Sequence, residues 1–136
     1  MAKDNKSQKG KDKGKVQKEE RNFLYLLPEP VVAANLAKVL DFLERRQIEI
    51  WTEVNLLELT FQAGTLTFED MMPELTDEAD LSLLADMGMK QVYACDYDAA
   101  DAASVKKVME CLLACYGGIL ASDTEDFKPF LKPEEL

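Results

Sequence analysis

The chain has 136 residues, the size of one domain, and carries 26 acidic against 16 basic residues. It contains no histidine, which excludes Ser-His-Asp and Cys-His nucleophilic systems, histidine bases and metal sites that need imidazole. The odd count of three cysteines fits a reducing compartment. Because the N-terminus lacks the apolar middle of a signal peptide and no apolar stretch is long enough to span a membrane, the sequence predicts a cytoplasmic protein.

The charge is divided unevenly along the chain. Residues 1–21 hold eight basic and four acidic residues, a net charge of +4, whereas residues 22–136 hold eight basic and twenty-two acidic residues, a net charge of −14. The first segment has almost no apolar residue to bury, so the sequence predicts a disordered lysine-rich tail over 1–21 and one acidic domain over 22–136.

The ordered part is expected to begin at Asn22. The uninterrupted apolar run 23–27 predicts a buried strand, ended by Pro28 and Pro30. Apolar residues then recur at three- and four-residue spacing from Val32 to Leu43, which predicts a helix over about 30–46. Pro30 suits the first turn of that helix.

The region 47–75 gives a weaker pattern. Apolar residues alternate with polar ones from Ile48 to Val54, which is typical of a strand, but the alternation slips at Leu56-Leu57 before it resumes through Phe68. Such a slip indicates either a bulge or two strands that meet at a bend. A helix over 53–62 is the alternative.

The remaining elements follow in a clear order. Thr76 starts a short helix that Gly88 ends. A strand over 91–95, a helix over 99–116 and a strand over 119–121 come next, and the two strands of this last unit are expected to be parallel. The segment 127–136 contains two prolines and is expected to be irregular.

This order predicts an α+β fold with a single domain, in which an antiparallel or mixed sheet has helices on one face. Without the insertion at about 54–88 it resembles the ferredoxin-like order β-α-β-β-α-β. The resemblance lies in the order of elements, and no sequence motif accompanies it.

Two acidic clusters each follow a predicted strand, one over 96–101 and one over 123–126. If the two strands are parallel, both clusters lie at one end of the sheet, near the start of the first strand. Clustered carboxylates are ligands for Mg²⁺ or Ca²⁺, which makes Asp96, Asp98, Asp123 and Asp126 candidate metal ligands. The other interpretation is that Asp98 caps a helix and that 123–126 is a solvated turn, because neither cluster has EF-hand spacing.

The cysteines do not predict a zinc site. Cys111 lies about 20 Å along the predicted helix from its start, near which the strand ending at Cys95 joins it. Cys111 and Cys115 are close to the apolar stripe of the helix, where cysteine acts as a small hydrophobic residue, so all three are expected to be structural.

No Gly-rich phosphate loop or nucleophile motif occurs, and no cofactor is expected. Nucleic acid is not expected as a partner because the acidic domain repels a polyanion. Membrane binding is not expected either, because the tail lacks the apolar face of a membrane helix. We therefore expect a non-catalytic protein-binding or regulatory module that acts through an acidic surface, with a basic protein or a second copy of the chain as partner. The alternatives are a divalent-metal-binding protein or metal-dependent enzyme using clusters 96–101 and 123–126, and a small-molecule sensor.

Overall fold

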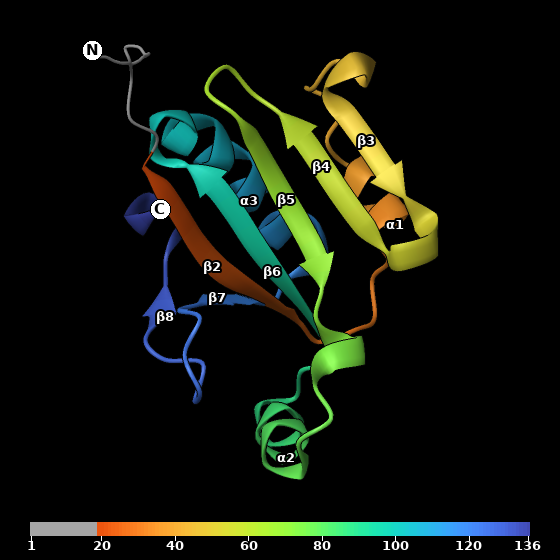
Figure 1. Ribbon diagram of the computed structural model, residues 1–136, viewed down its shortest axis with the longest axis vertical. Coiled ribbons are helices and arrows are strands. Elements are labelled where there is room, and N and C mark those ends of the chain that lie inside the picture. Colours follow the sequence, from red (N-terminus) through yellow and green to blue (C-terminus); the bar gives the residue numbers. More distant parts are fainter. Residues whose placement is uncertain (1–18) are drawn as a thin grey trace, which may run out of the picture.

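A computed structural model describes residues 19–136, and in this part of the chain seven strands form one sheet (Figure 1). The strands are β2 (Glu20–Leu27), β3 (Ile48–Trp51), β4 (Leu56–Thr60), β5 (Thr65–Asp70), β6 (Gln91–Asp98), β7 (Ile119–Ala121) and β8 (Phe130–Leu131). Their order in the sheet is β3-β4-β5-β6-β2-β7-β8, and every neighbouring pair is antiparallel. The predicted α+β class is confirmed. The ferredoxin-like order is not confirmed, because the sheet has seven strands. Residues 1–18 of the predicted tail lie outside the described residues. Glu20 and Arg21, which were also predicted to belong to the tail, are the first residues of β2.

The three α-helices of the described residues are α1 (Ala33–Lys38), α2 (Glu78–Met87) and α3 (Ala102–Tyr116). In Figure 1, α1 and α3 lie behind the sheet, whereas α2 lies at its lower end. Leu84 of α2 packs with Leu24 and Leu26, which point to the face opposite α1 and α3. The expectation of helices on one face is therefore wrong for α2. Within residues 19–136 no helix has both the length and the apolar content needed to cross a membrane.

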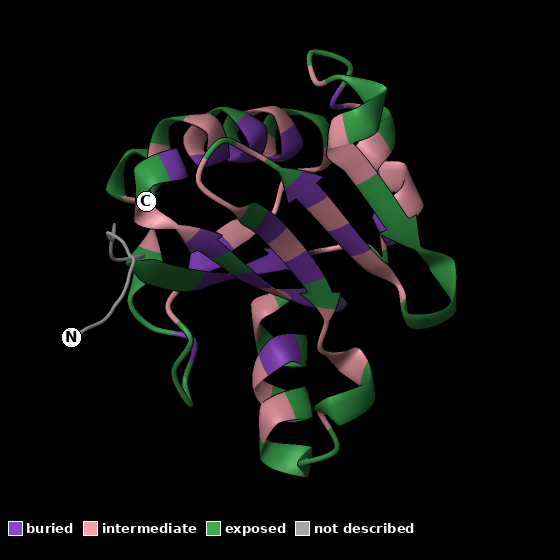
Figure 2. Ribbon diagram, turned by 45° about the horizontal axis from the view of Figure 1, so that its top comes forward, coloured by how far each residue is buried: buried purple, intermediate pink, exposed green. Residues whose placement is uncertain are grey.

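The central strand β2 supplies both sides of the hydrophobic core. Phe23, Tyr25 and Leu27 are buried against α1 and α3, while Leu24 and Leu26 are buried on the opposite face with α2. Successive side chains of a strand point to opposite faces, so an uninterrupted apolar run is what a strand covered on both sides requires. Figure 2 shows that buried residues run along the central strands of the sheet.

The first helix is much shorter than predicted. Instead of spanning 30–46, α1 ends at Lys38, and the chain continues through turns in which Leu40 N–H donates to the Ala37 carbonyl and Leu43 N–H donates to the Leu40 carbonyl. These bonds reach back three residues, as in a 3₁₀ turn. Leu36 and Leu40 are buried all the same, because successive turns satisfy the same three- to four-residue spacing as a helix.

The break in the alternation of apolar and polar residues at Leu56-Leu57 marks the boundary between two strands, β3 and β4. A 3₁₀ turn over Thr52–Val54 joins β3 to β4, and Asn55 after it has a left-handed backbone with φ 53°. Leu57 and Leu59 then point into the core. The bend was one of the two predicted interpretations, and the alternative helix over 53–62 is wrong.

Side chains around Asn55 form a polar network that ties four parts of the chain together. The Asn55 side-chain carbonyl accepts from Ala33 N–H at 2.7 Å, and its Nδ2 donates to Asp70 and to the Tyr93 hydroxyl, each at 3.0 Å. The Tyr93 hydroxyl donates to the Val31 carbonyl at 2.6 Å. Burial raises the pKa of Tyr93, so this hydroxyl stays protonated as a donor. The network fixes the start of α1 against β4, β5 and β6.

The second half of the chain agrees with its predicted order, with changed bounds. Strand β6 runs to Asp98, three residues beyond the predicted end, and both β6 and β7 pair antiparallel with β2, so they are parallel to each other as expected. The α2 helix is capped by Asp77, whose carboxylate accepts from Ala79 N–H at 2.9 Å, and not by the predicted Thr76. The segment 127–136 is not wholly irregular, because it contains β8, which pairs with β7.

Candidate functional site

The sheet face opposite α1 and α3 carries a continuous row of polar side chains across five strands. The registers place Glu49 opposite Glu58, Glu58 opposite Thr67, Thr67 opposite Asp96 and Asp96 opposite Asn22. Their chain neighbours, such as Leu57, Leu59, Leu66 and Cys95, are buried on the helix side. Alternation along each strand therefore turns the row away from α1 and α3.

We name this surface the acidic face. Its strand positions hold six carboxylates and, within residues 19–136, no lysine or arginine: Glu20, Glu49, Glu58, Glu69, Asp96 and Asp98. Glu49 lies directly opposite Glu58, and Glu20 directly opposite Asp98. Like charges at such cross-strand positions destabilise a sheet. The ion pairs among the described residues, Arg21–Glu19 and Arg46–Glu44, involve none of the six.

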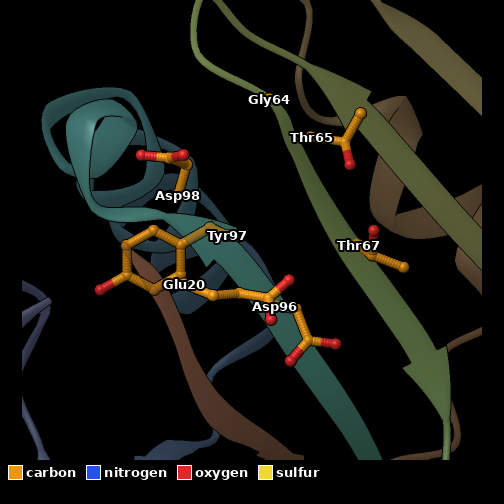
Figure 3. Close-up of a pocket in the computed structure, with 7 residues that line it drawn as sticks. All are labelled: Glu20, Gly64, Thr65, Thr67, Asp96, Tyr97 and Asp98. Atoms are coloured by element: carbon orange, nitrogen blue, oxygen red, sulfur yellow. The ribbon is translucent and has the colours of Figure 1, made fainter. Parts of the chain in front are cut away.

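A shallow hollow of about 410 Å³ lies in the acidic face beside the turn between β4 and β5 (Figure 3). Figure 3 shows the carboxylates of Glu20 and Asp96 near each other over β6, with Thr65 and Thr67 on the neighbouring strand. Partial burial raises the pKa of Asp96, and repulsion by Glu20 and Asp123 raises it further. A positive group placed here would relieve that repulsion.

Of the four predicted metal ligands, two lie near each other, and the other two accept hydrogen bonds from residues close to them in the sequence. Asp123 lies close enough to Asp96 to raise the pKa of the Asp96 carboxylate, although the two residues belong to different predicted clusters. Asp98 instead accepts from Ala100 N–H at 2.9 Å, which is the capping role considered from the sequence, and Asp126 accepts from the Thr124 hydroxyl at 3.1 Å. Within residues 19–136 no three acidic or cysteine side chains are grouped so that they could hold a metal ion. The metal site stays a prediction.

Asp101, the last acidic residue of the first cluster, has a structural role that the sequence did not indicate. It is only 6% exposed, and its two carboxylate oxygens accept from Ala63 N–H and Gly64 N–H, each at 3.0 Å. These donors belong to the tight turn between β4 and β5. Asp101 thereby holds the β4–β5 hairpin against the start of α3, and it does not face the hollow.

The cysteines differ from one another in exposure. Cys95 is buried and Cys111 is half-buried, with its thiol donating to the Val39 carbonyl at 3.2 Å, but Cys115 is exposed. The prediction that all three are structural is therefore wrong for Cys115. The inward position in that turn of α3 is taken by Tyr116, whose hydroxyl donates to the Asn35 carbonyl at 2.6 Å.

Sequence reasoning missed most of the acidic face. The alternation from Ile48 to Val54 predicts Glu49 only as a polar strand position, and the predicted tail over 1–21 includes Glu20. The available signal was that the polar positions of three successive strand segments are filled by acidic residues and threonine and never by a basic residue. That pattern predicts one charged sheet face, but it can be recognised only when the strands are placed side by side.

Comparisons of the chain with protein-family models, with curated proteins and with solved structures find no match.

Proposed function

We propose that this chain is a non-catalytic protein-binding module that uses its acidic face to bind a basic segment of a partner protein. The observation that carries the proposal is the set of six carboxylates on one sheet face, two pairs of which are directly opposite each other. Natural sheets avoid such pairs unless something offsets their repulsion. A lysine- or arginine-rich segment lying across the strands offsets it most directly.

Two further features of the face support a protein partner. Thr60, Thr65 and Thr67 place hydroxyl groups between the carboxylates, and these can both donate and accept hydrogen bonds. Trp51 and Phe130 are exposed at opposite edges of the sheet on this face, where each can pack against an apolar group of the partner.

The proposal is tested by titrating the full chain with a synthetic lysine-rich peptide. Trp51 is the only tryptophan and lies on the acidic face, so its fluorescence reports binding. Exposed charge pairs contribute up to about 1 kcal/mol each, so neutralising Glu58 and Asp96 together is expected to weaken binding by about 5- to 30-fold.

The matched control neutralises two exposed acidic residues of α2, Glu78→Gln and Asp86→Asn, which changes the net charge by the same amount. This control is expected to bind the peptide as the original chain does. An equal loss of affinity in both double variants would show that the peptide senses only the net charge, and would refute the acidic face as a binding site.

A divalent-metal-binding protein is the second candidate function, favoured by the hollow in which the carboxylates of Glu20 and Asp96 lie near each other. Calorimetric titration with Mg²⁺, Ca²⁺ and Mn²⁺ tests it. Binding heat that disappears in the double variant Asp96→Asn and Asp123→Asn would support a metal site. The absence of binding heat at millimolar metal concentrations would refute divalent-metal binding as the function.

A further inference from the structure

Strand β3 forms one edge of the sheet, and its outer side has no neighbour among the described residues. The backbone N–H and C=O groups of an edge strand can pair with another chain, and proteins usually prevent this with lysine, proline or a bulge. The opposite edge is protected in this way, because β8 has two residues and lies between Pro129 and Pro133. The sequence of β3, Ile-Glu-Ile-Trp, contains neither lysine nor proline.

Exposed apolar side chains gather around this edge. Of the seven large apolar side chains exposed within residues 19–136, four are Val32, Ile50, Trp51 and Val54, and Val54 is 62% exposed. Next to them lies an apolar hollow lined by Val32, Ala33, Ala34, Ile50, Thr52 and Asn55. Such a concentration of apolar surface at an unpaired edge is typical of an interface.

We propose that β3 pairs with β3 of a second copy of this chain, in an antiparallel arrangement that continues the sheet across a two-fold axis at Ile50. An antiparallel pair keeps residues of the same face opposite each other. In this register, Ile50 meets Ile50 of the second copy and Glu49 meets Trp51. Moving the two-fold axis from Ile50 to Glu49 would place Glu49 opposite Glu49, where the like charges repel each other.

The charges at the two ends of β3 match this arrangement. Arg45 and Arg46 precede the strand and Glu53 follows it, and all three are exposed. An antiparallel pair brings the arginine end of one copy to the Glu53 end of the other, and the two-fold axis repeats this contact. A second copy therefore supplies its own complementary charges. This inference deepens the homodimer expected from the sequence, and it does not depend on the acidic face.

Sedimentation velocity of the full chain tests the dimer. We expect a dimer for the original chain and a dimer dissociation constant at least about tenfold weaker for Ile50→Glu, since this change places like charges opposite each other on the two-fold axis. Leu81→Glu is the control, because Leu81 is a comparably exposed apolar residue on α2. A monomeric original chain, or equal weakening by both variants, would overturn the proposal.

A charge exchange tests the register. Glu53→Arg alone is expected to weaken the dimer, and adding Arg46→Glu in the same chain is expected to restore it. Failure of the double variant to restore association would refute the antiparallel contact between these ends. Binding of the lysine-rich peptide, measured by calorimetry because Trp51 lies in the dimer contact, is expected to be unchanged in Ile50→Glu. The dimer and the acidic face can therefore be refuted separately.

Discussion

Replacement of Asn55 by alanine is expected to destabilise the domain by about 3 to 5 kcal/mol, a large part of the total stability of a domain this size. The side chain makes three hydrogen bonds, to Ala33 N–H, Asp70 and Tyr93. Neutral bonds contribute about 1 kcal/mol each and a bond to a carboxylate about 1.5 kcal/mol or more. The left-handed backbone at φ 53° adds about 1 kcal/mol of strain for alanine, which asparagine tolerates better.

Urea unfolding followed by circular dichroism measures this loss. Asn55→Gly removes the same hydrogen bonds but tolerates the left-handed backbone, so we expect it to be about 1 kcal/mol more stable than Asn55→Ala. A loss below about 1 kcal/mol in the alanine variant would refute the importance of the network. A glycine variant less stable than the alanine variant would refute the backbone argument.

Three other substitutions test separate parts of the fold. Gly118→Ala is expected to lower the free energy of unfolding by about 3 to 5 kcal/mol, because its φ is +94° and a Cβ atom would lie 2.2 Å from the Leu26 carbonyl oxygen. Gly88→Ala is the control: its φ is +72° but the space around it is open, so the same unfolding assay should show a loss of only about 1 kcal/mol. Asp101→Ala removes two bonds to the β4–β5 turn and should cost about 2 to 4 kcal/mol by the same measurement; a loss within error would contradict its clamping role. Asp96→Asn should raise the melting temperature at neutral pH, because the pKa of Asp96 is raised in the folded state and its charge therefore destabilises the fold above that pKa. The advantage of asparagine should vanish below about pH 3, where the Asp96 carboxylate is protonated in both the folded and the unfolded state of the original chain. An advantage that persists unchanged into acid would argue against charge repulsion.

Where one physical signal dominates, the sequence predicts the fold well. Helix α3 was predictable because Val105, Val108, Met109 and Leu112 form a single apolar stripe, and all four are buried. Apolar spacing alone could not separate a helix from successive turns, so the region from Val39 to Leu43 was assigned to a helix that ends earlier.

Strand β6 extends three residues past its predicted end at residue 95, and these residues carry part of the acidic face. Asp96 and Asp98 alternate with Cys95 and Tyr97, which are buried, so the two charges lie on the face of the strand away from the core. A strand with one uncovered face tolerates a charge at every second position. Which face is uncovered depends on where α1, α2 and α3 pack, and that is a property of the assembled molecule.

The position of β2 also determines when the domain can fold during synthesis. Strand β2 is synthesised first among the described residues, whereas its two neighbours, β6 and β7, are synthesised late. Leu24 and its partner Ala94 are about 70 residues apart in the sequence. Contacts between such distant residues make folding slow. The pairs β3–β4 and β4–β5 are local and can form early, whereas the apolar residues of β2 stay uncovered until β6 and β7 have left the ribosome.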